Sequence, residues 1–338
     1  MNNNLQERVF TQILSLYPKR SAAVDELSSV LGVGKDAIYR RFRGDTLMTP
    51  EELVVLAQKY SISLDALIYE KTDTVFFRFN PFSHNVSSFE DYLTTIVKDL
   101  EGMNAMPGTH IRYASSEIPF FYYAYFPELI SFKLYIFGRT IWNFDYLEGQ
   151  SFSFDLVSYP DIRLTKEMLD GYRSIPTTEL WNLNIMDNTL NQIEYHVNSD
   201  GFKDNADALL LYDKLIELAN HMEFMASQGC KCNLEDAPEE NSTNLVLYHN
   251  EMLYTNNTIL VKTAQQGLLY TTFTSPNFLI SADKRMYKFT ENWFNKLMQK
   301  ATPLSTNAEK SRKNFFKKLR KKVESAKLRV RLQIELED

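Results

Sequence analysis

Hydrophobic residues recur at helical spacing through the first seventy positions, with short polar breaks between the runs. Apolar side chains at steps of three and four form one stripe, which is the pattern of an amphipathic helix. The clearest start is at Thr49, where Pro50 suits the first helical turn and Glu52 completes a capping box. The pattern predicts five short helices, at residues 5–17, 22–31, 35–43, 50–60 and 64–68.

A tight turn joins the second and third of these helices. It begins at Gly32, a residue type that readily adopts the left-handed conformation in which many helices end. Only Val33 and Gly34 then precede the third helix. Two short helices with so brief a connection are typical of a helix-turn-helix.

Two stretches, VDELSSVLGVGKDAIYRRFRG and MTPEELVVLAQKYSISLDALI, resemble the lambda-repressor-like (Cro/CI-type) family of DNA-binding domains. The resemblance covers roughly residues 5–70, and its more specific part is the ending SLDALI. Ser28 departs from the family pattern, in which alanine is usual, and Gly34 stands where a capping serine or threonine is common. The resemblance implies a domain over residues 1–70 that binds double-stranded DNA.

The third helix supplies the candidate DNA contacts. At about 100° per residue, Ile38 and Phe42 share the side expected to be buried, and Arg40 points nearly opposite. Lys and Arg donate to guanine, Asp accepts from cytosine, and Tyr can reach a phosphate. The predicted contacts are Lys35, Asp36, Tyr39, Arg40 and Arg43 on this helix, with Lys19, Arg20 and Thr46 at neighbouring helix ends. The competing interpretation is a helical bundle with a solvated basic helix.

Helical and strand-like segments alternate beyond a polar linker at residues 69–74. Strand-like runs rich in β-branched and aromatic residues follow one another after residue 244, and these predict an antiparallel sheet. We expect an α+β domain over residues 75–300 that dimerises the chain or senses an effector. Its predicted helices are 89–102, 186–198, 204–228 and 284–299, and its predicted strands are 75–80, 109–114, 244–249, 257–264 and 266–273.

Two apolar segments of this region have alternative interpretations. Residues 118–146 hold 12 of the 45 aromatic residues of the chain, and such a cluster either fills a core or lines an apolar ligand pocket. Leucine and methionine recur between residues 211 and 225 at steps of four and three. That stripe fits a buried core face or a dimer seam.

Charge is distributed unevenly behind the formal net charge of −6. Residues 1–72 hold 9 basic and 9 acidic side chains, residues 73–308 hold 17 and 29, and residues 309–331 hold 11 and 2. An acidic bulk repels DNA, so any nucleic-acid contact is expected to be local. Residues 301–338 follow the α+β domain as a third part of the chain, and the sequence predicts a basic amphipathic helix within them. It fits a docked terminal helix, an extra nucleic-acid contact or a helix on an anionic membrane surface.

Motifs for catalysis, cofactors and metals are not found in the sequence. It contains no phosphate-binding loop, dinucleotide fingerprint, zinc-protease motif or nucleophile elbow, and its five histidines are scattered. Cys230 and Cys232 have no second pair at ligand spacing, so no structural zinc is expected. Without a signal sequence or a span of about 18 apolar residues, the chain is predicted to be cytoplasmic and not a membrane protein.

These features predict a bacterial-type, sequence-specific transcription regulator rather than an enzyme. One small module buries little DNA surface, and such proteins usually read two half-sites about 34 Å apart, so a homodimer is expected. The larger domain would respond to a small-molecule or protein effector. The alternative is a ligand-sensing or protein-interaction module in which DNA binding is secondary.

Overall fold

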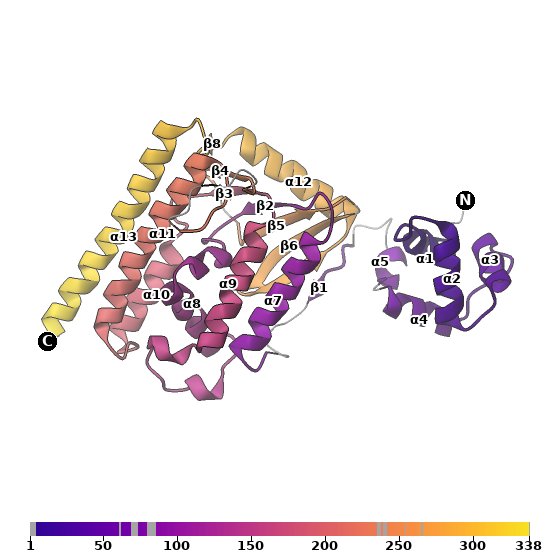
Figure 1. The fold of residues 1–338 in the computed structure, drawn as a ribbon, viewed down its shortest axis with the longest axis horizontal. Coiled ribbons are helices and arrows are strands. Elements are labelled where there is room, and N and C mark those ends of the chain that lie inside the picture. The colour runs from indigo at the N-terminus through magenta and orange to yellow at the C-terminus, as the bar shows by residue number, and fades with distance from the viewer. Residues whose placement is uncertain are drawn as a thin grey trace. The chain divides into compact units, whose positions relative to one another are not determined.

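Helix and strand are both present in the computed structural model, and the mixed α and β content predicted from the sequence is confirmed (Figure 1). The chain divides into two compact units, Met1–Phe76 and Phe77–Asp338. Residues 301–338, which the charge pattern sets apart, therefore belong to the second unit. The structure describes residues 5–60, 62–68, 74–79, 86–234, 238, 242–253, 255–264 and 266–337.

The described part of the first unit is helical. Its core contains apolar side chains with no solvent exposure, so the stripes predicted from the sequence face a common centre. These side chains are Val9, Ile13, Leu27, Ile38 and Leu56. The helices are α1 (Leu5–Leu14), α2 (Arg20–Leu31), α3 (Lys35–Arg43), α4 (Pro50–Lys59) and α5 (Leu64–Ile68).

The helix-end signals of this unit are confirmed. Gly32 ends α2 with a φ of 65°, in the left-handed region that glycine tolerates best. At the start of α4 the Thr49 hydroxyl accepts the Glu52 amide N–H at 3.2 Å, and the Glu52 carboxylate accepts the Thr49 amide N–H at 3.1 Å. This reciprocal pair satisfies two backbone donors that the first helical turn leaves without partners.

One mixed sheet of eight strands lies in the described part of the second unit, in the order β1-β7-β6-β5-β2-β3-β4-β8. The predicted antiparallel sheet is wrong for its centre, where β2, β3 and β4 pair in parallel. The remaining neighbours pair antiparallel. The strands are β1 (Arg78–Phe79), β2 (His110–Ala114), β3 (Thr177–Trp181), β4 (Leu245–His249), β5 (Thr258–Lys262), β6 (Gly267–Thr274), β7 (Asn277–Ser281) and β8 (Thr302–Pro303).

Helical crossovers explain the parallel pairing. Parallel neighbours need a connection that returns the chain to the same end of the sheet, usually through helices. Since β2, β3 and β4 follow one another in both sequence and space, right-handed crossovers place their helices on one face. Between β2 and β3 lie the 3₁₀ segment η1 (Phe120–Tyr125), α8 (Pro127–Thr140) and α9 (Tyr159–Arg173), and between β3 and β4 lie α10 (Asp187–Asn198) and α11 (Asn205–Gln228).

The two faces of the sheet are covered unequally (Figure 1). The crossover helices and α7 (Phe89–Asn104) build the large core on one face, to which β2 contributes Ile111 and Tyr113. On the other face α12 (Lys284–Gln299) inserts Phe294 against Leu260 of β5. The alternating side chains of a strand face opposite sides, so the central strands carry apolar residues on both.

The basic terminal helix α13 (Glu309–Glu337) packs along α11. Its apolar stripe is buried in the main core, and the leucine and methionine stripe of α11 is buried with it, so both stripes are core faces. Charges on α13 pair with the acidic body, and the interpretation as a docked terminal helix is confirmed. The ion pairs are Arg320–Glu223, Lys322–Asp187, Lys327–Asp213 and Arg329–Glu194.

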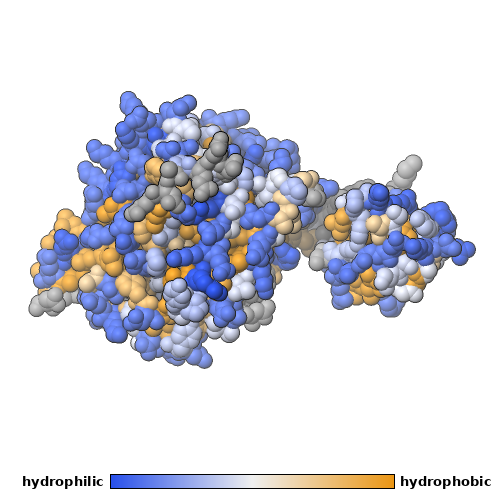
Figure 2. All heavy atoms as spheres, viewed as in Figure 1, coloured by the Kyte–Doolittle hydropathy of each residue, from blue (hydrophilic) through white to orange (hydrophobic). Residues whose placement is uncertain are grey.

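A second apolar stripe near the C-terminal end of α13 lies in solvent. Leu328, Leu332 and Leu336 follow at steps of four and are 57%, 52% and 87% exposed. Figure 2 shows hydrophobic residues gathered at the end of the second unit that carries the C-terminus. Most of the rest of the visible surface of that unit is hydrophilic. Exposed leucines aligned on one helical face mark a surface suited to association.

A carboxyl group lies at the centre of the main core. Glu179 of β3 has no solvent exposure, and four side chains from three elements donate hydrogen bonds to it. A buried carboxyl group without such partners would destabilise the fold strongly. The donors are the hydroxyls of Tyr122, Tyr172 and Thr177, at 2.6, 2.9 and 3.2 Å, and the Trp181 indole N–H, at 3.0 Å.

Lys231 is buried next to this group. Its ammonium lies 4.1 Å from the centre of the Tyr172 ring and donates to the backbone carbonyls of Tyr172 and Ile175. Burial lowers the pKa of Lys231 to about 7, although the Glu179 carboxyl group opposes the shift. Because the unfolded chain keeps an ordinary lysine pKa, the charged form of Lys231 destabilises the folded state most at low pH.

We expect the folded state to gain stability from Lys231 deprotonation as the pH rises from about 7 towards 10.5. Lys231→Met removes this titration, so its stability relative to wild type should fall over that range, by up to about 1.4 kcal/mol per pH unit. Denaturant unfolding followed by tryptophan fluorescence measures this, because all three tryptophans lie in the second unit. The exposed Lys166→Met is the control, and a pH-independent difference for Lys231→Met would contradict the assignment.

Candidate nucleic-acid interface and apolar cavity

The turn between α2 and α3 is fixed by side chain as well as backbone. The Ser28 hydroxyl donates to the Val33 carbonyl at 2.5 Å, and the Val33 N–H donates to the Ser28 carbonyl at 3.2 Å. The serine that departs from the family pattern therefore closes the turn. Gly34 precedes the first residue of α3, Lys35, in extended conformation and provides no side-chain cap.

The inner face of α3 is apolar. Ile38 is fully buried, and the Phe42 ring meets the Phe10 ring edge-on at 4.6 Å between centroids. The Arg20 guanidinium lies 4.8 Å from the centre of the Phe42 ring. This face sets the rotation of α3 about its own axis, which decides which side chains point outward.

A buried amide holds the C-terminal end of α3. Gln6 of α1 is 6% exposed, and its amide nitrogen donates to the carbonyls of Arg41 at 2.7 Å and Thr46 at 3.0 Å. Its amide oxygen accepts the Met48 N–H at 2.6 Å. Gln6 is not among the residues predicted from the sequence. Its signal was the position of a polar side chain on the same helical stripe as Val9.

An ion pair joins α3 to α4. Arg41 donates to both carboxylate oxygens of Glu52, at 3.0 and 2.7 Å, and the two side chains are 12% and 14% exposed. Two parallel hydrogen bonds fix orientation better than one. Glu52 thus serves both the cap of α4 and the placement of α3.

All eight side chains predicted to contact DNA belong to exposed residues. Lys35 pairs with Asp25 at 2.5 Å, and Arg43 pairs with Asp45 at 2.7 Å. The hydrogen bond to Asp25 raises the pKa of Lys35. Such exposed ion pairs contribute little to stability and can exchange partners. Five of the side chains share α3, namely Lys35, Asp36, Tyr39, Arg40 and Arg43, while Lys19, Arg20 and Thr46 lie outside it.

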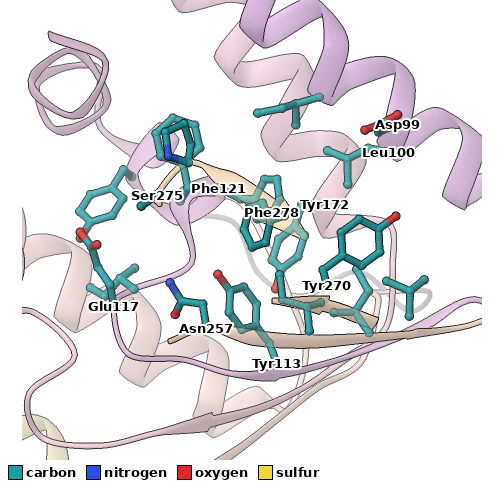
Figure 3. A pocket seen from close by; sticks show the side chains of 18 of the residues that line it. Asp99, Leu100, Tyr113, Glu117, Phe121, Tyr172, Asn257, Tyr270, Ser275 and Phe278 are labelled. Atoms are coloured by element: carbon teal, nitrogen blue, oxygen red, sulfur yellow. The ribbon is translucent and has the colours of Figure 1, made fainter. Parts of the chain in front are cut away.

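A cavity of about 160 Å³ lies in the second unit, between α7 and η1 on one side and the sheet on the other (Figure 3). Its walls are almost entirely apolar and aromatic. The segment 118–146 supplies part of them and also fills the core around them, so the core interpretation of its aromatic cluster is confirmed and ligand binding stays a prediction. The helical side contributes Tyr92, Ile96, Leu100, Phe121 and Phe137, and the sheet contributes Ile111, Ile259, Val261, Phe278 and Ile280.

Polar atoms enter this cavity at few places. Figure 3 shows the Tyr113 side chain rising from the sheet into it, and Tyr113 is 5% exposed. Its hydroxyl has no hydrogen-bond partner among the described residues, and burial raises the pKa of Tyr113 above the ordinary range. The Asn257 amide oxygen accepts from the Ser116 backbone and hydroxyl, which leaves the Asn257 amide nitrogen to the cavity. Asp99 is exposed and lies at the rim.

One end of the cavity is closed by a buried ion pair, Glu117 with Lys133. Burial alone would raise the pKa of Glu117, but the Lys133 ammonium and neighbouring hydrogen bonds hold it below its ordinary value. Asn188 donates to its second oxygen at 2.9 Å, and Gln192 accepts from Lys133 at 2.8 Å. The pair is therefore satisfied within the protein.

No family model, curated protein or solved structure matches the chain. Among the described residues, no group of three or more His, Cys, Asp or Glu side chains is placed to hold a metal ion, and Cys230 and Cys232 are buried and form no disulfide. Of the helices in the described ranges, none has both the length and the apolar composition that a membrane crossing requires.

We expect Gln6→Ala to loosen the end of α3. It removes the acceptor of the Met48 N–H and the donor to two carbonyls, and each buried group left without a partner costs about 1–3 kcal/mol. Hydrogen–deuterium exchange at the Met48 amide should become at least about tenfold faster. Gln12→Ala on the exposed face of α1 is the matched control, and unchanged exchange in Gln6→Ala would argue against the anchor.

Proposed function

We propose that this protein is a sequence-specific DNA-binding transcription regulator. In this proposal α1 to α5 form a lambda-repressor-like helix-turn-helix domain, and α3 enters the major groove. The observation that carries it is the division of α3 into two faces. Ile38 is buried, while Lys35, Asp36, Tyr39, Arg40 and Arg43 are exposed, so the helix presents a polar, mainly basic surface to solvent.

The dimensions and chemistry of α3 support this role. An α-helix with its side chains is about 10–12 Å in diameter, and a major groove about 12 Å wide admits it. Arg40 makes no ion pair within the described part of the chain, so its guanidinium is available for the paired acceptors of guanine. Lys35 and Arg43 would exchange their exposed carboxylate partners for phosphates or bases.

Charge outside α3 limits how the protein could bind. Residues 1–72 carry no net charge. Several basic side chains of α13 form ion pairs with acidic side chains of the second unit. General attraction to DNA would therefore be weak. Binding would depend on the local set of contacts around α3, with Lys19 and Thr46 on phosphates.

Arg40→Ala should lose discrimination between a selected site and its mutated versions, by about 1–3 kcal/mol, because it removes a base contact. Lys19→Ala should weaken binding to all sequences alike and reduce the salt slope by about one, because it removes a phosphate contact. Sites would be selected from genomic fragments, and affinities measured by fluorescence anisotropy across salt concentrations.

Lys166→Ala is the matched control, since it removes an exposed positive charge from the second unit. It should leave both affinity and discrimination unchanged. Equal affinities of wild type and Arg40→Ala for every fragment would refute the role of Arg40. Failure of the wild-type protein to select any site would refute the function.

We further propose that the regulator acts as a homodimer, which lets two copies of α3 read two half-sites. The exposed leucine stripe of α13, formed by Leu328, Leu332 and Leu336, is the proposed dimer interface. If two such helices pair antiparallel about Leu332, Arg329 of one copy faces Glu335 of the other. The stripe is thus self-complementary in charge as well as apolar, which an interface with two-fold symmetry requires.

Leu332→Lys should convert a dimer into a monomer, because it places a charge at the centre of the apolar stripe. Analytical ultracentrifugation at micromolar concentration measures the change. Leu16→Lys is the control, since Leu16 is an exposed leucine of the first unit at 61% exposure. A monomeric wild type would overturn the dimer, and a Leu332→Lys variant that remains dimeric would place the interface elsewhere.

A further inference from the structure

The cavity beneath α7 is large enough for a small ligand, and most of its wall is apolar. Apolar cavities of roughly 150 Å³ remain dry and accept benzene-sized molecules. This cavity has about 160 Å³ of space, and its walls come from α7, η1 and the sheet. The protein loses packing by leaving such a volume empty, because lining atoms without neighbours forfeit dispersion contacts.

Several of the polar groups that line the cavity are uncharged. The Tyr113 hydroxyl and the Asn257 amide nitrogen have no hydrogen-bond partner among the described residues, and Figure 3 shows both side chains directed into the same space. Tyr270 adds a second hydroxyl, and burial raises its pKa to about 12. At neutral pH these groups are uncharged donors, suited to one hydroxyl or carbonyl oxygen.

The charged groups in the cavity do not favour an ionic ligand. Glu117 and Lys133 neutralise each other and are satisfied by protein partners, so neither offers a free charge. Asp99 at the rim repels anions. A ligand ion would lose its hydration in the apolar interior without gaining a buried counter-charge, and that loss is large.

We infer that the cavity binds an uncharged molecule about the size of one aromatic ring that carries a single hydroxyl or carbonyl oxygen. The ring packs between the aromatic side chains of Phe121 and Phe278, and its oxygen accepts a hydrogen bond from Tyr113. This binding site is distinct from the proposed DNA-binding surface, and its test needs no DNA.

The first experiment compares three probes of one size and different charge on the full chain. These are p-cresol, benzoate and benzylamine, tested by thermal unfolding and by isothermal titration calorimetry. We expect p-cresol to raise the unfolding midpoint and to bind at least about tenfold more tightly than either ion. Absence of p-cresol binding overturns the inference. Equal or tighter binding of benzylamine would contradict the inference that the ligand is uncharged, and it would indicate an aromatic site for cations.

Two variants locate the site. Tyr113→Phe keeps the ring and removes the hydroxyl, so p-cresol should bind about threefold to tenfold more weakly, whereas the exposed Tyr195→Phe should bind as wild type does. Ile96→Trp fills the cavity and should abolish binding. Unchanged binding in either Tyr113→Phe or a folded Ile96→Trp overturns the site. Should Ile96→Trp fail to fold, Tyr113→Phe decides, because its shape is nearly that of wild type.

Discussion

The second unit depends on the hydrogen bonds that surround one buried carboxyl group. Glu179 cannot be buried in the core without donors, so Tyr122 of η1, Tyr172 of α9 and Trp181 of β3 must all reach it. This requirement sets the distance between the helical layer and the sheet. It also orients the Tyr172 ring, which lines the cavity, so the space beneath α7 is a by-product of how that carboxyl group is satisfied.

The first unit uses the same principle on a smaller scale. The Gln6 amide and the Arg41–Glu52 ion pair satisfy groups that would otherwise be buried without partners, and both act on α3. Since polar anchors require specific geometry, they fix the position of the helix more strictly than apolar packing does. Because the contacts that hold α3 in place are made away from its exposed face, the side chains on that face remain available.

Local signals in the sequence predicted local structure well. The capping box at Thr49, the left-handed end at Gly32 and the stripe of α13 each depend on residues a few positions apart, and the structure confirms them. The exposure of the α3 side chains followed from helical periodicity in the same way.

Structure that depends on distant segments could not be predicted in this way. Strand β3 has only five residues, and it carries Glu179, whose polarity conceals a buried strand. Its parallel pairing with β2 requires a crossover of more than sixty residues, which no short pattern encodes. Tyr122 lies 57 residues from Glu179, and the partners of Gln6 lie 35 to 42 residues away, so no short spacing in the sequence reveals these contacts.

One of the two shortest strands of the described sheet lies directly after the boundary between the two units. Strand β1 consists of Arg78 and Phe79, and it pairs at the sheet edge with β7, where Arg78 lies opposite Ile280. Ile280 is also a wall of the cavity. So few backbone hydrogen bonds make β1 one of the segments that detach at lowest free energy. By thermodynamic reciprocity, any occupant of the cavity that binds more tightly while β1 is attached must also hold β1 at the edge of the sheet.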